Sequence, residues 1–151
     1  MNTINKPLIV LVEDDKFQRG DYQSELETVI PDAEVRAFAC GVEFLDAYEK
    51  RPERIPDVFV IDLMLEWRKE WVKTQRPMPQ NRSEQAMTAM MCLEAVRSYS
   101  PDVPIILWTR SDLKPRKDVV DSVKTFFWKK DRVIEGDVYN LIRKILASQK
   151  H

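Results

Sequence analysis

One short stretch, VFVIDLML at residues 58–65, limits the folds open to this chain more than any other. Its residues are nearly all branched or aromatic, without the polar alternation of a strand that has one face in water. Such a run predicts a strand covered on both faces, as in a parallel sheet under helices. Asp62, its one charged residue, lies near the carboxyl end, where open α/β sheets bind ligands. An aspartate that caps the following turn is the alternative interpretation.

Length and charge restrict the organisation of the chain. Its 151 residues are 44% hydrophobic, which suits one domain over residues 1–151. The 24 basic and 25 acidic residues are mixed along the chain, so no basic field is expected to bind nucleic acid or anionic lipid. No apolar run approaches the roughly 20 residues of a membrane-spanning helix, and the N-terminus lacks a signal-peptide layout. We therefore expect a cytoplasmic protein that binds neither nucleic acid nor membranes.

Cysteine and histidine usage excludes several kinds of site. Cys40 and Cys92 form no CxxC motif or Cys/His cluster, so we expect buried free thiols rather than a disulfide or a metal site. His151 is the one histidine and the last residue, which excludes a histidine-based catalytic mechanism.

Apolar patterning predicts five strands that alternate with helices. The expected strands are residues 7–12, 34–39, 58–65, 103–108 and 125–128. The expected helices are residues 16–30, 42–48, a third from about 83 to 100, a weak fourth over 112–124 and a fifth over 132–148. The first helix is expected to be modestly amphipathic, with apolar residues at Phe17, Leu26, Val29 and Ile30 among polar ones. This order builds a parallel sheet with right-handed crossovers and helices on both faces.

Three consecutive acids, Glu13, Asp14 and Asp15, directly follow the first strand. Adjacent carboxylates raise one another's pKa unless a cation offsets their charge. One of them can cap the following helix, where the dipole contributes up to ~1 kcal/mol, but three acids exceed that role. The pattern therefore predicts a bound cation.

The other strands also end in polar residues, and the carboxyl ends of parallel strands share one edge of the sheet. The side chains expected at that edge are Glu13, Asp14, Asp62, Thr109 and either Lys129 or Lys130. Carboxylates suit Mg²⁺, and a hydroxyl with an ammonium can take the remaining oxygens of a phosphoryl group. Asp62 can then act as the nucleophile that forms an aspartyl-phosphate.

Four separated motifs, LIVLVEDD, VFVIDLML, PIILWT and FFWKK, resemble those of the response-regulator receiver domain of two-component signalling. The resemblance covers the whole chain. It implies a flavodoxin-like doubly wound (βα)5 fold with a five-stranded parallel sheet of order 2-1-3-4-5. It also implies Mg²⁺-dependent transfer of a phosphoryl group from a histidine kinase or a histidine phosphotransfer protein.

The same resemblance implies a role for each site residue. Asp62 is similar to the phosphoacceptor, Asp14 and Asp62 to direct Mg²⁺ ligands, and Glu13 to a ligand that acts through water. The backbone carbonyl of Met64 completes the implied ligands, and Thr109 is similar to the switch hydroxyl.

The site lysine and the switch aromatic depend on each other in the fifth strand. Lys129 is favoured because two apolar residues separate it from Phe126, the implied rotating aromatic. If Lys130 were the site lysine, the aromatic would be Phe127.

The sequence departs from the family pattern in three ways. Arg110 stands where the family usually has a small residue, and the glycine-containing turn after the phosphoacceptor strand is missing. An insertion at about 66–85 takes its place, and loops longer than roughly 12–15 residues are usually functional or disordered. One interpretation is a flap in which Trp67 and Trp71 dock a partner or cover the site. The other is a solvated insertion whose tryptophans pack back on the domain.

We therefore expect a receiver that catalyses its own phosphorylation and dephosphorylation and signals by contact with a downstream protein. The resemblance also implies that two copies of the chain can pair as a homodimer. The alternative is a receiver-fold interaction module that works without phosphorylation and binds through the insertion. A hydrolase is disfavoured because Met64 stands where such enzymes place a second acid, and nucleotide binding because a glycine-rich phosphate loop is missing.

Overall fold

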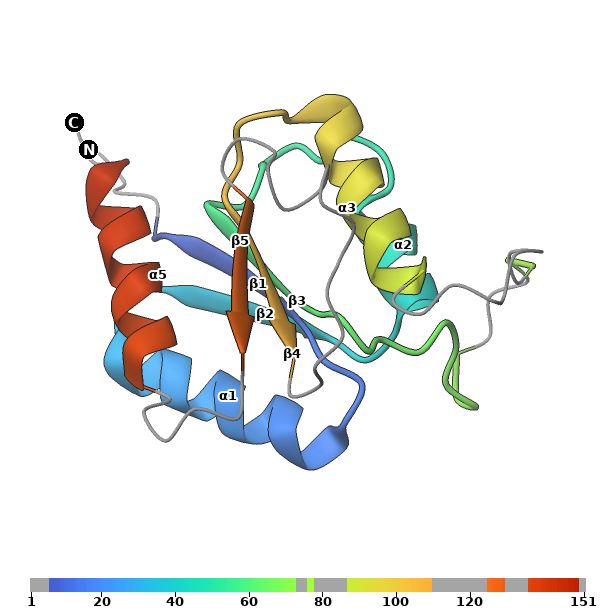
Figure 1. Ribbon diagram of the computed structural model, residues 1–151, viewed down its shortest axis with the longest axis horizontal. Helices are drawn as coiled ribbons and strands as arrows, with labels where there is room; N and C mark the ends of the chain where they lie inside the picture. The colour runs from blue at the N-terminus through green and yellow to red at the C-terminus, as the bar shows by residue number, and fades with distance from the viewer. Residues whose placement is uncertain (1–5, 73–75, 78–86, 110–124, 130–135, 150–151) are drawn as a thin grey trace.

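The computed structural model describes residues 6–72, 76–77, 87–109, 125–129 and 136–149. At positions 109, 125, 127–129, 136 and 137 the description covers the backbone alone. The described elements form three layers, with a parallel sheet between two layers of helices (Figure 1).

The sheet has the order β2-β1-β3-β4-β5, and each neighbouring pair of strands is parallel. Its strands are β1 (Leu8–Val12), β2 (Glu34–Phe38), β3 (Val58–Asp62), β4 (Ile105–Thr109) and β5 (Thr125–Lys129). Every residue of β1 and β3 is buried, as the continuous apolar runs predict. The third strand was predicted to reach residue 65, but β3 ends at Asp62. The chain turns out of the sheet there, because the Met64 N–H donates to Asp62 Oδ1 (3.0 Å) instead of to a neighbouring strand.

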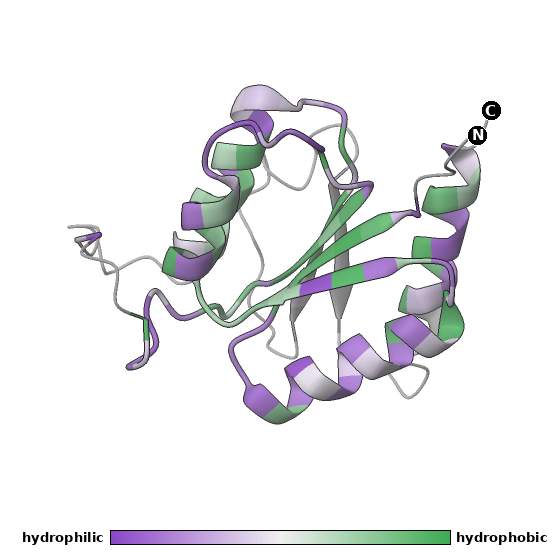
Figure 2. Ribbon diagram, turned by 180° about the vertical axis from the view of Figure 1, so that it is seen from behind, coloured by the Kyte–Doolittle hydropathy of each residue, from purple (hydrophilic) through white to green (hydrophobic). Residues whose placement is uncertain are grey.

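Four helices in the described residues cover the two faces of the sheet: α1 (Lys16–Val29), α2 (Gly41–Tyr48), α3 (Met87–Tyr99) and α5 (Gly136–Ser148). Strand residues alternate between two cores, so Val10 packs under α2 and α3 while Ile9 packs under α1 and α5. Figure 2 shows hydrophobic central strands and a more hydrophilic edge strand, β2. None of the helices in this described part of the chain is long and apolar enough to cross a membrane.

The predicted α/β class, with a parallel sheet under helices on both faces, is confirmed. The helix predicted over residues 112–124 and the predicted start of the third helix near residue 83 lie outside the described residues. The full set of five βα units therefore stays a prediction.

Helix α1 faces the sheet through Tyr22 and Leu26, which are buried, and the Tyr22 ring lies 4.2 Å from that of Trp108 between centroids. Phe17, another apolar residue of this helix, is 80% exposed. Nine residues at about 100° each separate Phe17 from Leu26, which puts the two side chains on opposite sides of the helix.

The predicted buried free thiols are confirmed for Cys40 and Cys92, which lie in the core under α2 and α3. Burial raises the pKa of Cys92, so this thiol stays neutral and packs as a small apolar group.

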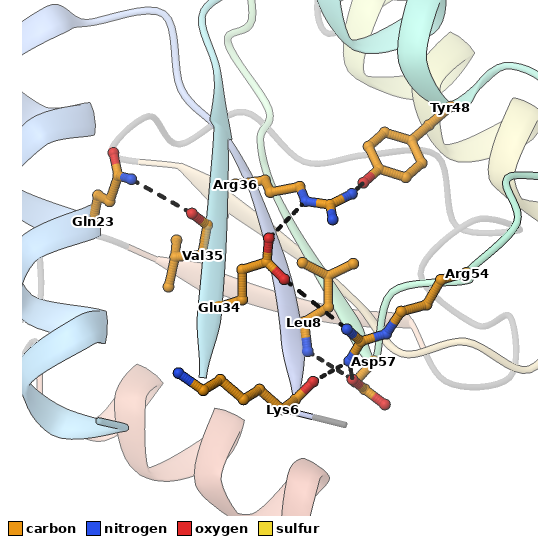
Figure 3. Close-up of polar contacts among 9 residues, drawn as sticks. All are labelled: Lys6, Leu8, Gln23, Glu34, Val35, Arg36, Tyr48, Arg54 and Asp57. Atoms are coloured by element: carbon orange, nitrogen blue, oxygen red, sulfur yellow. Dashed lines mark hydrogen bonds and ion pairs between the residues drawn. The ribbon is translucent and has the colours of Figure 1, made fainter. Parts of the chain in front are cut away.

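A polar network fixes the amino ends of the strands (Figure 3). Asp57 Oδ2 accepts from the Leu8 N–H (2.7 Å), and the Arg54 guanidinium lies 3.6 Å from Asp57 and 4.0 Å from Glu34. Arg36 bonds to both Glu34 (3.2 Å) and the Tyr48 hydroxyl (3.2 Å). Partly exposed ion pairs such as these stabilise only weakly. Their effect is to hold the starts of β1 and β2 and the chain entering β3 in one register.

Gly41 allows α2 and α3 to approach closely. A Cβ atom at this position would lie 2.3 Å from Cγ2 of Thr88 in α3 and 3.4 Å from the ring of Trp67. Because both neighbours are buried, neither can move away without disturbing the core.

We expect Gly41→Ala to lower the free energy of unfolding by about 1–3 kcal/mol, because the new methyl group overpacks this contact. Thr88→Ser in the same chain removes the opposing methyl group and should restore part of the loss. Gly20→Ala is the matched control: no atom lies within 4 Å of the added Cβ. In a helix this control should gain about 0.5–1 kcal/mol. Chemical denaturation measures all three, and a Gly41→Ala chain as stable as the natural one would contradict the packing.

Candidate functional site

Three carboxylates meet at the carboxyl edge of the sheet, beyond β1 and β3. One oxygen each from Glu13, Asp14 and Asp62 lies within 4.8 Å of the other two. The register that pairs Val12 with Ile61 causes this, because it places the next residue of each strand at the same level. Glu13 is 2% and Asp62 7% exposed, while Asp14 is partly exposed.

The three consecutive acids after β1 divide between two roles. Asp15 turns away from the cluster and caps α1, where its Oδ1 accepts the N–H groups of Phe17 and Gln18 (2.9 Å each). Glu13 is fixed through its backbone, since its N–H donates to the Phe38 carbonyl at 3.0 Å. One acid therefore satisfies the helix terminus, and two remain beside Asp62.

Backbone contacts orient Asp62 at the end of β3. Its Oδ1 accepts from the Met64 N–H (3.0 Å), and the Leu63 N–H donates to the Trp108 carbonyl of β4 (2.8 Å). These bonds fix the turn that carries the carboxylate.

The electrostatics of Asp14 reflect the crowding of negative charge. Its pKa lies above the ordinary value, first because burial disfavours the charged form and second because the Asp62 charge repels it. The Glu66 N–H, which donates to Asp14 Oδ2 at 3.1 Å, and the Lys69 ammonium act in the opposite direction, while the Glu66 carboxylate adds to the rise. A cation bound at the cluster would offset the repulsion between these carboxylates.

The donor set fits Mg²⁺. Within the described residues it consists of carboxylate oxygens from a partly open cluster, and Mg²⁺ favours a few carboxylates while keeping several waters. Zinc and copper sites usually include imidazole or sulfur ligands.

The structure places the backbones of Thr109 and Lys129 at the same edge. They are the last residues of β4 and β5 and pair with each other, and Asp62 pairs with the adjacent Trp108. Their side chains, and Lys130 and Arg110 as a whole, lie outside the described residues. The choice between Lys129 and Lys130 therefore stays a prediction.

Two further roles stay predictions: the Met64 backbone carbonyl as a metal ligand, and Phe126 as the rotating aromatic. Met64 lies in the turn after β3, where its N–H contacts Asp62 and its side chain is 48% exposed. Phe126 of β5 is partly buried against the core under α1 and α5.

The first part of the insertion, residues 66–72, is called the strap below, and it packs on the domain. The carbonyls of Glu66 and Trp67 accept the N–H groups of Gly41 and Val42 (2.9 Å each). These amides belong to the first turn of α2, whose N-cap residue Cys40 makes no side-chain capping bond. Backbone carbonyls of the strap thus take the place of a capping side chain, a contact that has no local signal in the sequence.

The two tryptophans of the strap have opposite environments. Trp67 is 6% exposed and belongs to the core under α2 and α3, whereas Trp71 is 58% exposed. Arg76, just beyond the strap, bonds to Asp46 (3.3 Å) and Glu49 (2.6 Å) of the α2 region. Trp67 therefore packs back on the domain, as one of the two interpretations of the insertion predicts, and docking of a partner through Trp71 stays a prediction.

Comparison with known proteins identifies the fold. No protein-family model matches the chain, and no curated protein matches it in sequence. Among solved structures, it is similar to the non-phosphorylated HemR receiver domain from Leptospira biflexa, with 20% identity and a TM-score of 0.66 over 97% of this chain and 99% of that one. It is also similar to the receiver domain of sensor histidine kinase PA1611 from Pseudomonas aeruginosa, solved with a magnesium ion in the active-site cleft (14% identity, TM-score 0.63, 95% and 99% covered).

A further similar structure is the response regulator TrrA from Thermotoga maritima in complex with Mg²⁺ and BeF (16% identity, TM-score 0.62, 92% and 98% covered). At these identities the likeness establishes the fold, and the chain has the fold of response-regulator receiver domains. The resemblance to receiver domains that the four motifs indicate is therefore confirmed for the fold.

We expect Trp67→Ala to lower the free energy of unfolding by about 3–5 kcal/mol, because it leaves a large cavity under α2 and α3. Trp71→Ala removes the same side chain from an exposed position and should change stability by less than about 0.5 kcal/mol. Urea denaturation of both variants measures the difference. Equal losses would show that the strap is not held as described.

We expect Asp14→Asn to stabilise the metal-free chain, because the amide oxygen can still accept from the Glu66 N–H while the repulsion with Asp62 disappears. Asp14 is partly exposed, so screening should limit the gain to about 0.5–1 kcal/mol. That gain corresponds to roughly 1–4 °C in the midpoint of thermal unfolding. The variant should also lose any stabilisation by Mg²⁺. A lower midpoint without metal would contradict the electrostatic picture.

Proposed function

We propose that this chain is a receiver that accepts a phosphoryl group on Asp62 in a Mg²⁺-dependent reaction. The observation that carries the proposal is the approach of three carboxylates within 4.8 Å at the carboxyl edge of a receiver fold. Solved neighbours with this fold include one with Mg²⁺ in its active-site cleft and one with Mg²⁺ and BeF.

The donor is a phosphohistidine of a sensor histidine kinase or a histidine phosphotransfer protein. A carboxylate oxygen of Asp62 attacks the phosphorus, so that a P–O bond forms while the P–N bond breaks and its electron pair stays on the imidazole nitrogen. The Met64 N–H fixes the orientation of the attacking carboxylate. Thr109 and Lys129, whose backbones end the neighbouring strands, are assigned to the phosphoryl oxygens.

Mg²⁺ has its ligands among the same residues. Asp14 and Asp62 are assigned as direct ligands, Glu13 as a ligand through water, and the Met64 backbone carbonyl as the remaining protein ligand. Bound Mg²⁺ would neutralise charge on the phosphoryl oxygens during transfer.

The signal leaves by protein–protein contact in the cytoplasm. Phosphorylation adds a charge of about −1.5 to −2, which draws the Thr109 hydroxyl and the Lys129 ammonium and biases the surface near β5 and α5. Phe126 in β5 is assigned as the aromatic that turns with them. The downstream target and the pairing of two copies through this face belong to the same proposal.

One observation favours a second function, that of an interaction module which works without phosphorylation. Trp71, a residue type common at the centres of interfaces, is 58% exposed on a strap that is otherwise fixed to the domain. In that case the insertion at about 66–85 would carry the binding.

Intact mass after incubation with acetyl phosphate tests the principal proposal. With Mg²⁺ the natural chain should gain one phosphoryl group, and it should gain none after chelation of the metal or in Asp62→Asn, which lacks the nucleophile. Asp21→Asn removes an exposed carboxylate of α1 and serves as the control that should be modified normally.

Equal modification of Asp62→Asn and the natural chain would exclude Asp62 as the acceptor. If no chain is modified while Trp71→Ala abolishes binding of a partner, the interaction module is the better account.

A further inference from the structure

The strap brings a lysine to the acidic cluster. The side chain of Lys69 is only 18% exposed, and its ammonium lies 2.8 Å from Glu66 Oε2. Lysine is rarely buried to this extent without a partner. Its position is therefore set by a specific contact rather than by solvent.

Glu66 connects this lysine to the cluster through its backbone. The Glu66 N–H donates to Asp14 Oδ2 at 3.1 Å, so one residue holds both Lys69 and a carboxylate of the cluster. The pKa of Lys69 is raised, chiefly by its bond to Glu66 and further by the Glu66 and Asp14 charges, while burial and the Arg19 charge oppose the rise. Lys69 in turn lowers the pKa of Asp14, and its effect is larger than that of the Glu66 carboxylate, which raises the pKa.

A second cation near the cluster has a different role. The Arg19 guanidinium of α1 donates to the backbone carbonyl of Glu13 at 2.9 Å, so this contact is to the main chain. Lys69 is held by a side-chain pair with Glu66 within the strap, and its charge interacts with that of Asp14.

A fixed ammonium has opposite effects on the two states of such a site. Without metal it offsets part of the repulsion among the carboxylates, and when a divalent cation binds it repels that cation. By linkage, a group that stabilises the metal-free state more than the metal-bound state lowers the affinity for the metal.

We propose that Lys69 is a built-in counter-cation of the Glu13, Asp14 and Asp62 cluster, which stabilises the metal-free protein and weakens Mg²⁺ binding. This role rests on the proposed function, in which the cluster holds Mg²⁺. It makes Lys69 a positioning residue of the strap that sets how much Mg²⁺ the receiver needs before it can accept a phosphoryl group.

Calorimetric titration with Mg²⁺ tests the proposal on four variants of the full chain. Lys69→Gln should bind Mg²⁺ about two- to tenfold more tightly than the natural chain, and the gain should shrink at high ionic strength. Lys69→Met, which keeps an apolar stem in the strap, should behave in the same way. Lys69→Arg keeps the charge and should bind as the natural chain does. Lys50→Gln removes an exposed charge beyond the far end of α2 and should also leave the affinity unchanged.

Thermal unfolding gives a second measurement that does not depend on phosphorylation. Lys69→Gln should unfold at a lower temperature than the natural chain without Mg²⁺, and added Mg²⁺ should raise its midpoint by more. A merely structural role would lower the midpoint equally with and without the metal.

The outcomes separate this proposal from the proposed function. If the natural chain binds Mg²⁺ and both neutral variants bind it equally or more weakly, the role of Lys69 is overturned while the metal site stands. If no chain binds Mg²⁺, both are overturned. If only the neutral variants bind measurably, the counter-cation role is supported in its strongest form.

Discussion

Carboxylates at the ends of β1 and β3 repel one another, and the neighbouring contacts hold these groups in place and offset part of their charge. The two strands are central and wholly buried, and their register fixes Glu13 and Asp62 at one level. The Asp57 and Arg54 contacts at the other edge hold that register. Around the cluster, the Glu66 N–H and the Lys69 ammonium offset part of the charge. The repulsion that remains among these carboxylates is what a bound cation would offset.

Much of the sheet could be predicted from the sequence because its signals are local. Apolar runs mark β1 and β3, and the acids that follow them must lie at the same edge once the strands are parallel. The roles of Asp14 and Asp15 could not be separated in this way. Asp15 caps α1 because its backbone is extended (φ −77°, ψ 119°) and its side chain meets two amides.

The strap could not be predicted because its contacts are distant in sequence. Trp67 and Trp71 are the same residue type and lie four positions apart, yet only Trp67 reaches the core. Its burial depends on the carbonyls of the strap that cap α2 and on the space that Gly41 leaves beside Thr88. Phe17 shows the limit of apolar content as a signal, because its angular position on α1 leaves it exposed.

A crystal structure of the chain with Mg²⁺ and beryllofluoride, an analogue of the phosphoryl group, would show whether Asp62 is the phosphoacceptor. We expect beryllofluoride on a carboxylate oxygen of Asp62, Mg²⁺ beside Asp14 and Asp62, and the side chains of Thr109 and Lys129 on the fluorides. A cluster without metal or analogue at saturating concentrations, or an analogue bound to another residue, would contradict this expectation.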